Sequence, residues 1–396
     1  MDLKALAGID RRGRGKVVMG FDHGDLGLLN RVLVTPDNPG ADEREIGGQG
    51  FEAEGILVHG GLGIENTRAL CNNQGMNTSS LNRRAFLRDC LGPIAAAGLI
   101  PAPRLLARSS PTVPPQSIRL GGPVFPKTDD PAELALAHRR SGYRAAYCPN
   151  VSLNDAARVR AFADAFAKQD VVIAEVGRWC NIMDPDSEKR RKNLETVTEG
   201  LALAEAIGAR CCVDIAGSYN PTVWYGPHPG NLSAQFFDAT VANARQIIDA
   251  VKPRRTKLCF EMMGWAIPDS PDRYLKLIKA VNRPAFAVHL DPCNLVNSPE
   301  KFYDNTALLN ECFDKLGRWI ASCHAKDLAW EIEMNVHFRE VRPGTGTLDY
   351  ATYLRRLARL PQNPPLMLEH LATAEEYGQA RDYIVGVGTQ EGLRFG

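Results

Sequence analysis

The chain has 396 residues, of which 44% are hydrophobic and 23% are charged, and its formal net charge is +1. The composition is that of an ordinary globular protein, and so small a net charge argues against nucleic acid or an acidic membrane surface as the main partner. No apolar stretch reaches the roughly 18 residues needed to cross a bilayer, so we expect no stable membrane span. The ten cysteines include no C-x-x-C pair and several lie in apolar runs, which predicts core residues rather than a disulfide framework.

Residues 1–75 differ in composition from the rest of the chain. They are rich in Gly, Arg and Asp, with "DRRGRGK" and "GGQGFEAEG", and they show no sustained helical or strand period. We therefore predict a weakly ordered extension, or upstream sequence translated from a wrongly chosen start.

Residues 76–108 resemble a twin-arginine export signal. The stretch "RRAFL" at 83–87 has the paired arginines followed by x-Phe-Leu, and a modest apolar segment at 91–100 precedes small residues near Ala107. The resemblance implies a natural start at Met76, maturation near Ala107 and export to the periplasm. The alternative is an amphipathic surface helix, and a chain that does not use the signal would stay in the cytoplasm.

From residue 118 onward, short β-like runs alternate with amphipathic segments. Eight such units predict an α/β fold, a (β/α)8 TIM barrel over 109–396, because these barrels need about 250 residues. A doubly wound open sheet is the alternative, but its first βα turn normally carries G-x-G-x-x-G, which "LGGPVFPKTDD" does not supply. The runs are "IRLGG" (118–122), "YRAAYC" (143–148), "VVIAEV" (171–176), "CCVDIAG" (211–217), "KLCFEMM" (257–263), "FAVHLD" (286–291), "WIASCH" (319–324) and "PLMLEH" (365–370).

The last four predicted strands each deliver a metal-competent side chain to the same rim. Catalytic groups of such barrels sit at the carboxyl ends of the strands. Strand alternation places His289 on the face of Asp291, and Lys326 on the face of His324. The groups at the strand ends are Glu261, His289 with Asp291, His324, and Glu369.

These motifs resemble the xylose-isomerase-like barrels of sugar (phosphate) isomerases and epimerases, which include ketose 3-epimerases, hydroxypyruvate isomerase and inosose dehydratase. The similarity runs from residue 118 to about 384 and rests on "CFEMMGW", "HLDPCNLV", "CHAKDL", "RPGTGTLDY" and "MLEHL". It implies that the metal ligands are Glu261, Asp291, His324 and Glu369. Ketose epimerases have a substrate-binding histidine three residues after the aspartate, where this chain has Asn294. The difference argues against a simple ketohexose or ketopentose substrate.

Three carboxylates and one imidazole suit one divalent ion. Mn²⁺ is our first expectation, and Mg²⁺, Co²⁺ and Zn²⁺ are alternatives. Such an ion would polarise a substrate carbonyl and stabilise an enediolate. Glu261 and Glu369 could then remove and return a proton. Lys326 would bind a substrate hydroxyl or stabilise the oxyanion, and Asp327 would orient Lys326 or His324.

Other residues are candidates for substrate binding. His289 could contact substrate or make a structural hydrogen bond, and the same alternatives hold for Glu175 and Asp214. The loop "SYNPTVWYGPHPGN" predicts a lid that contributes His228, or else a packed surface loop. We expect substrate contacts from His289, Asn294, Lys326, His228 and Trp265, the last as an apolar wall. The "GTGTLDY" glycines are expected to shape a turn.

The predicted function is a metal-dependent isomerase or epimerase of a sugar or sugar-like hydroxy-ketone. A lyase acting on a 3-keto-glycoside is the nearest alternative, since it begins with the same proton abstraction. A non-catalytic sugar-binding barrel is a further one. An abasic-site endonuclease would need more histidine ligands and a basic groove. The expected partner is a small carbohydrate, a free sugar, inositol derivative or oxidised glycoside if the protein is exported, and a homo-oligomer stays open.

Overall fold

The computed structural model describes residues 7–9, 15–17, 115–126 and 128–396. The chain divides into two compact units, Met1–Leu29 with Pro111–Gly396, and Asn30–Ser110. Within the first unit, the short strands β1 (Ala7–Ile9) and β2 (Gly15–Val17) pair antiparallel. The predicted export signal and most of the predicted extension lie outside the described residues, so both stay predictions.

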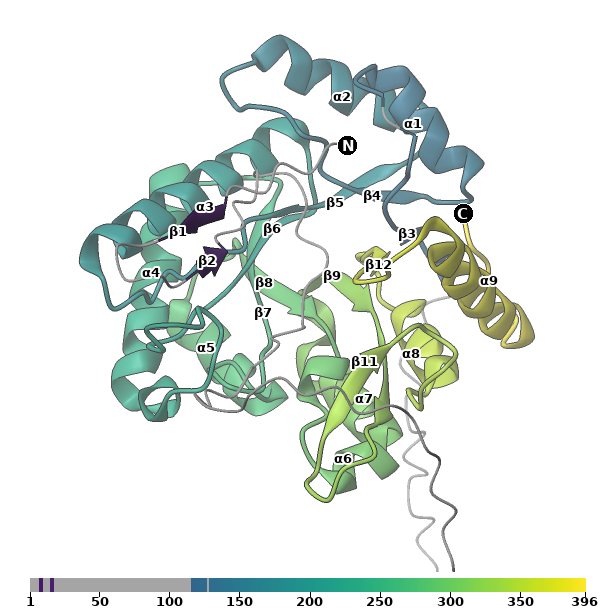
Figure 1. Ribbon diagram of the computed structural model, residues 1–396. Helices are drawn as coiled ribbons and strands as arrows, with labels where there is room; N and C mark the ends of the chain where they lie inside the picture. The colour runs from purple at the N-terminus through teal and green to yellow at the C-terminus, as the bar shows by residue number, and fades with distance from the viewer. Residues whose placement is uncertain (1–6, 10–14, 18–114, 127) are drawn as a thin grey trace, which may run out of the picture. The chain divides into compact units, whose positions relative to one another are not determined.

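Eight parallel strands close into a barrel, which confirms the predicted (β/α)8 fold (Figure 1). Each predicted β run overlaps one of these strands. The ring closes between the last and the first of them, where Leu366 lies opposite Leu120. The strands are β3 (Leu120–Gly121), β4 (Ala145–Tyr147), β5 (Val172–Gly177), β6 (Cys211–Ile215), β7 (Lys257–Glu261), β8 (Phe286–Leu290), β9 (Ile320–Ala325) and β12 (Leu366–Leu368).

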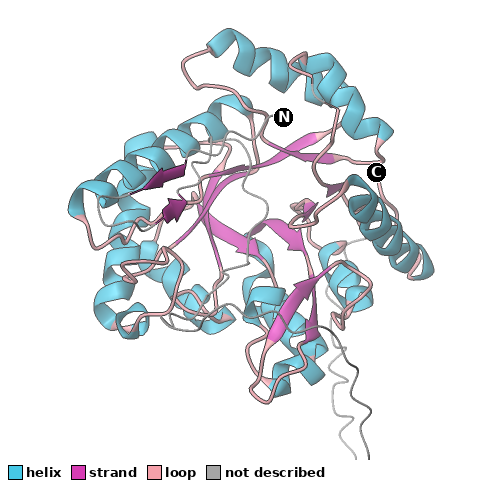
Figure 2. Cartoon of the chain, viewed as in Figure 1, coloured by secondary structure: helices cyan, strands magenta, loops and turns pink. Residues whose placement is uncertain are grey.

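Helices cover the outside of the barrel (Figure 2). They are α1 (Pro131–Arg140), α2 (Ala156–Lys168), α3 (Ser187–Ile207), α4 (Ala234–Val251), α5 (Pro271–Val281), α6 (Pro299–Tyr303), α7 (Asn305–Leu316), α8 (Tyr350–Leu357) and α9 (Ala374–Gln390). In α5 the Ser270 hydroxyl accepts a hydrogen bond from the Arg273 backbone and so caps the first turn, a contribution of about 1 kcal/mol. The buried Tyr274, Leu277 and Val281 follow the helical period and face the barrel.

A β-hairpin extends the seventh barrel unit, and the sequence pattern did not reveal it. Its strands β10 (Asp327–Trp330) and β11 (Phe338–Val341) pair antiparallel directly after β9. Phe338 stacks on Phe302 of α6, with 4.8 Å between ring centroids. The hairpin therefore holds β11, and with it Glu340, beside the mouth of the barrel.

Small side chains fill the barrel interior beneath the rim. Cys211, Val213, Cys259 and Ala287 form one buried layer. Cys259 and Ala287 lie two positions before Glu261 and His289, so strand alternation directs all four side chains inward. The eight cysteines of the described part of the chain are free thiols, and five of them are buried: Cys211, Cys212, Cys259, Cys312 and Cys323. No helix in this part is long and apolar enough to cross a membrane.

Candidate metal centre

Four side chains from neighbouring strands converge at the carboxyl end of the barrel. Glu261 ends β7, Asp291 follows β8, His324 lies on β9 and Glu369 follows β12. Each offers one ligand atom, and these atoms all lie within 4.8 Å of one another. The structure thus brings together the four residues that the resemblance indicated.

The imidazole of His324 has a different environment at each nitrogen. Its Nδ1 lies 2.7 Å from Glu369 Oε1, 3.4 Å from Glu261 Oε1 and 3.8 Å from Asp291 Oδ2. Its Nε2 lies 3.0 Å from Glu175 Oε1, within hydrogen-bonding geometry. The ring is fully buried, so these groups are its polar surroundings. One nitrogen faces the three carboxylates and the other faces Glu175.

Lys326 places an ammonium group among the same carboxylates. Its Nζ lies 2.8 Å from Asp291 Oδ2 and 2.6 Å from Glu369 Oε1, with Glu261 and Glu340 each at 3.8 Å. Burial disfavours the charge, but the carboxylates outweigh it and hold the pKa of Lys326 well above its usual value. The lysine therefore compensates part of the negative charge gathered at the rim.

The pKa values of the three carboxylates are shifted in different directions. Burial raises the pKa of each, but the positive charge on Lys326 and His324 outweighs it at Asp291 and Glu369, whose pKa values are lowered. At Glu261 burial wins, and its pKa is raised. Burial opposes the charge on His324 too, yet the surrounding carboxylates hold its pKa well above the usual value.

The donor set fits a divalent cation. Among the residues that the structure describes, none donates a properly directed hydrogen bond to the buried Asp291 Oδ2 or Glu369 Oε1, although both oxygens lie within ion-pair distance of Lys326 and His324. Each of these oxygens therefore keeps a lone pair that a cation could accept. Three carboxylates and an imidazole are ligands that Mn²⁺ and Mg²⁺ accept.

Asn294 contacts this cluster directly. It lies on the short helix η2 (Cys293–Leu295) and donates from Nδ2 to Glu261 Oε1 over 2.8 Å. The amide therefore holds one of the converging carboxylates in place, which gives a physical role to the residue that departs from the ketose epimerase pattern.

The predicted rim residues His228 and Trp265 lie on two adjoining loops. Nδ1 of His228 accepts a hydrogen bond from the Gly230 backbone at 3.0 Å, and the ring of His228 packs edge-on against Tyr219. The indole of Trp265 is exposed, and its backbone carbonyl accepts from the buried Asn231 amide at 3.0 Å. Asn231 thereby ties the loop after β6 to the loop after β7.

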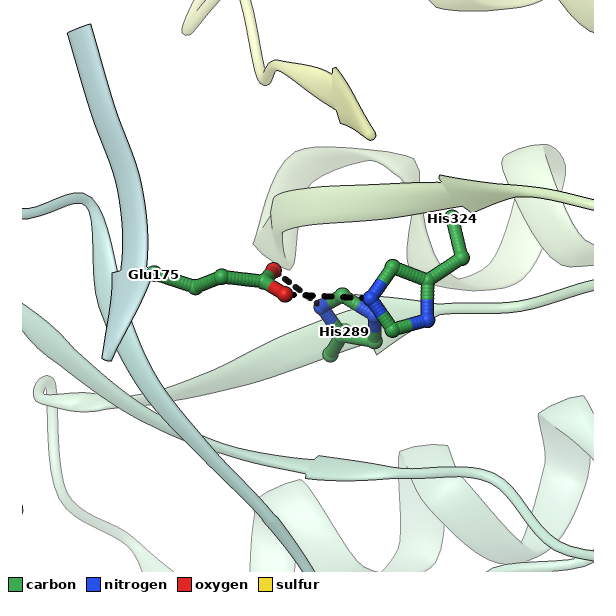
Figure 3. Close-up of side chains that lie close together, drawn as sticks. All are labelled: Glu175, His289 and His324. Atoms are coloured by element: carbon green, nitrogen blue, oxygen red, sulfur yellow. Dashed lines mark hydrogen bonds and ion pairs between the residues drawn. The ribbon is translucent and has the colours of Figure 1, made fainter. Parts of the chain in front are cut away.

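Glu175 lies on the Nε2 side of the His324 ring, and Figure 3 shows its carboxylate directed toward the rings of His289 and His324. His289 is fully buried, with its ring centroid 4.0 Å from that of His324. Burial lowers its pKa to about 4. Glu175 comes from β5 and accepts from the Ser322 hydroxyl at 2.9 Å as well as from His324. The sequence left open whether Glu175 contacts substrate or is structural. The feature that could have indicated its role inside the barrel is its position as a lone acidic residue in the apolar run "VVIAEV".

Asp327 does not orient Lys326 or His324, contrary to the sequence-based prediction. Its carboxylate accepts backbone hydrogen bonds from Gly344, Gly346 and Leu348, each at 3.0 Å. It begins β10, where it organises the "GTGTLDY" turn instead of facing the barrel. Asp214 is likewise structural, because it accepts from the backbone of Cys180 and of Ile215.

A pocket of about 560 Å³ lies beside the cluster. Its lining includes Glu340, Arg342 and His370, none of which the sequence analysis singled out. His370 follows Glu369 with a left-handed φ of 58° and places Nδ1 3.1 Å from Glu340 Oε1. Such a backbone is uncommon for a residue other than glycine, although histidine adopts it more readily than most.

A closed barrel of eight parallel strands with ionisable groups at the carboxyl strand ends is the architecture of the TIM-barrel enzymes. Residues 137–385, more than half of the chain, match the family described as Xylose isomerase-like TIM barrel, and the chain belongs to that family. No curated protein matches the chain significantly.

Solved structures share this fold at low sequence identity. A xylose isomerase domain protein from Planctomyces limnophilus aligns with a TM-score of 0.52 at 16% identity, over 70% of this chain and 99% of its own. A xylose isomerase-like TIM barrel protein from Mycobacterium smegmatis aligns at 0.50 and 18%, over 70% and 97%. A xylose isomerase domain protein from Alicyclobacillus acidocaldarius aligns at 0.50 and 18%, over 70% and 99%.

Proposed function

We propose that this protein is a divalent-metal-dependent isomerase or epimerase acting on a sugar or a sugar-like hydroxy-ketone. The observation that carries the proposal is the convergence of Glu261, Asp291, His324 and Glu369 within 4.8 Å at the carboxyl end of the barrel. Membership of the xylose isomerase-like family supports it. The M. smegmatis protein of the same fold was crystallised in complex with magnesium, which agrees with a hard divalent cation.

The four converging residues would hold the ion. Mn²⁺ remains our first choice, with Mg²⁺, Co²⁺ and Zn²⁺ as alternatives. When bound, the ion would polarise the substrate carbonyl and offset the negative charge that develops on its oxygen. Everything else in the reaction falls to the side chains of this chain.

We assign the transfer of the proton next to the substrate carbonyl to two carboxylates. Glu261 is fixed by the Asn294 amide, and Glu369 lies at the more open side of the cluster, where its side chain is 12% exposed. One would remove the proton to give the enediolate, and the other would return a proton to form product. Such acid–base catalysis accelerates reactions by about 10²–10⁴-fold. Lys326, between them, would donate a hydrogen bond to a substrate oxygen.

The substrate would bind at the metal ligands, next to the pocket of about 560 Å³ that Glu340, Arg342 and His370 help to line. Lys326, Trp265 and His228 are proposed contacts, and Asn294 is proposed to act chiefly through Glu261. His289 is fully buried below the cluster, and we do not place it against substrate. Export through the predicted signal at 76–108 would favour a free sugar, an inositol derivative or an oxidised glycoside.

The first test is metal analysis of the purified protein, followed by a substrate screen in deuterated water. We expect about one divalent ion per chain and solvent deuterium on a substrate carbon. His324→Ala should lose the ion, whereas Asp214→Asn, which alters a buried acid on β6 that does not touch His324, should keep it. A protein that takes up no divalent ion would contradict the proposal. Deuterium uptake with loss of a leaving group would identify the lyase instead.

Glutamine substitutions separate proton transfer from metal binding. Gln keeps the size of Glu and an oxygen for the ion but cannot accept a proton at neutral pH. Glu261→Gln and Glu369→Gln should each lose most turnover while one of them still exchanges label into the substrate. When the product is supplied instead, the other variant should be the one that exchanges label. Direct hydrogen transfer between carbons by the unmutated enzyme, without solvent label, would refute the two-carboxylate scheme and leave the metal site standing.

A further inference from the structure

We propose that Glu175, held by Ser322 and packed with His289, is a positioning residue that fixes which nitrogen of His324 is free to bind the ion. The inference rests on the metal site of the proposed function and assigns roles to residues that make no contact with the proposed ion. An imidazole that binds a metal ion is neutral and carries one N–H, so that one ring nitrogen donates and the other offers a lone pair.

The two tautomers of His324 would behave very differently at this site. If Nδ1 carried the proton, it would donate to the carboxylates of Glu261 or Glu369 and could not ligate a metal. If Nε2 carries it, the Nδ1 lone pair faces the three carboxylates. Because the ring is fully buried, the choice depends on the protein groups around it. The one carboxylate within hydrogen-bonding distance of Nε2 is Glu175, at 3.0 Å among the residues that the structure describes.

Glu175 is itself held rigidly. Its Oε2 accepts from the Ser322 hydroxyl at 2.9 Å and lies 3.4 Å from His289 Nδ1. It is 1% exposed, so water does not compete for these contacts. A carboxylate with one oxygen on Ser322 and the other on His324 accepts at both and donates at neither. The tautomer with the proton on Nε2 is therefore the one that Glu175 stabilises.

His289 and Tyr353 complete the support. The ring of His289 meets that of His324 edge-on at 4.0 Å, which restricts rotation of the ligand imidazole. Tyr353 donates from its hydroxyl to the His324 backbone carbonyl at 2.9 Å and fixes the strand. Figure 3 shows the Glu175 carboxylate pointing toward both rings, with the second ring nitrogen of His324 on the side away from it.

The same three side chains offer ligand atoms within 4.8 Å of one another and could be read as a second ion site. Two features favour the positioning role. Both oxygens of Glu175 already have donors, and an ion there would need the His324 Nε2 proton to leave so that one imidazole bridged two ions. This group also supplies a single carboxylate beside two imidazoles, whereas Mg²⁺ and Mn²⁺ favour oxygen ligands.

The test is a calorimetric titration of Mn²⁺ into metal-free wild-type protein and Glu175→Leu, with Glu175→Gln as the variant that preserves side-chain size. Removing a hydrogen-bond partner of a metal ligand weakens metal binding by about 10–100-fold, and we expect a loss in that range. Asp214→Asn is the matched control, a buried acid on the adjacent strand that does not touch His324, and its affinity should equal that of wild type. Circular dichroism establishes which variants are folded.

A second measurement reads the tautomer itself. Two-bond proton–nitrogen spectra of metal-free protein with ¹⁵N-labelled histidine, recorded at an alkaline pH where His324 is neutral, report which ring nitrogen carries hydrogen. We expect His324 to carry it on Nε2 in wild-type protein, and this signature should be lost in the Glu175→Leu and Glu175→Gln variants. If Glu175 had a purely structural role, its substitution would leave the hydrogen on Nε2 of His324.

The outcomes separate this inference from the proposed function. Wild-type protein that binds no ion overturns both. Wild-type binding with unchanged affinity in a folded Glu175 variant overturns the positioning role alone, as does hydrogen on Nδ1. Two ions per wild-type chain, with only one lost on Glu175 substitution, would show that the group is a second ion site instead.

Discussion

Lys326 and Asp291 form a buried ion pair, with Nζ 2.8 Å from Oδ2, at the point where the proposed metal ligands meet. The ammonium is 4% exposed and Asp291 is fully buried. The lysine is therefore the fixed positive charge that allows a group of buried carboxylates to exist without an ion. Removing one partner of such a pair leaves an uncompensated buried charge.

Lys326→Met should accordingly destabilise the metal-free protein by about 3–5 kcal/mol. Saturating Mn²⁺ should restore a large part of that stability, because the ion supplies positive charge to the same oxygens. Urea unfolding with and without Mn²⁺ measures both effects. The control is Lys315→Met, whose ammonium pairs with Asp272 and Glu311 at the surface and where a change of no more than about 1 kcal/mol is expected. An equal loss for Lys326→Met with and without the ion would contradict this reasoning.

Asn294→Ala should weaken Mn²⁺ binding by about 10-fold or more, since Glu261 loses the amide that orients it. Asn297→Ala is the matched control, because Asn297 lies in the same loop but its side chain accepts from Lys301. Calorimetric titration of both variants tests the contact. Equal affinities for the two variants would mean that Glu261 is held without Asn294.

Gly346→Ala should destabilise the fold by about 1–3 kcal/mol, the usual cost of an overpacked site. A Cβ at this position would lie 2.2 Å from Asp327 Oδ1 and 2.4 Å from the Leu328 carbonyl oxygen. Gly378→Ala in α9 is the control, since a Cβ there meets nothing within 4 Å and alanine in a helix interior is favoured by about 0.5–1 kcal/mol. Thermal unfolding should move in opposite directions for the two variants, and a shift in the same direction would refute the packing argument.

We expect His138 to make the free energy of unfolding depend on pH, independently of the metal site. It is buried on α1 with an unpartnered Nδ1, and burial lowers its pKa to about 4 from a usual value of 6.5. Between these two pH values the unfolded chain binds the proton and the folded chain does not. The contribution is therefore complete above pH 6.5 and is lost as the pH falls toward 4, by up to about 3 kcal/mol.

The measurement is the free energy of unfolding of wild-type protein and His138→Phe across this range. The variant should lack this pH-dependent contribution. The difference in the free energy of unfolding between wild type and variant should therefore change between pH 6.5 and 4 and stay constant above pH 6.5. A constant difference throughout would show that His138 titrates alike in the folded and unfolded chains.

Hydrophobic patterning was enough to predict the barrel and the strand ends that meet in it. Eight apolar runs alternating with amphipathic segments permit few topologies, and parallel strands in a closed ring bring their carboxyl ends to one rim. Glu261, Asp291, His324 and Glu369 could therefore be grouped from strand position together with the family resemblance. Strand alternation is a local property, and it placed Lys326 on the face of His324 as well.

The surroundings of those groups depend on how distant parts of the chain pack together. Glu175 reaches His324 across the barrel from a strand 149 positions away in sequence, a distance over which no local pattern carries information. The contacts of Asn294 and Asp327 could not be predicted from sequence, because their hydrogen-bond partners depend on how η2 and the β10–β11 hairpin fold back on the rim. Residue type and spacing set which groups can meet, whereas loop paths and side-chain packing set which atoms bond.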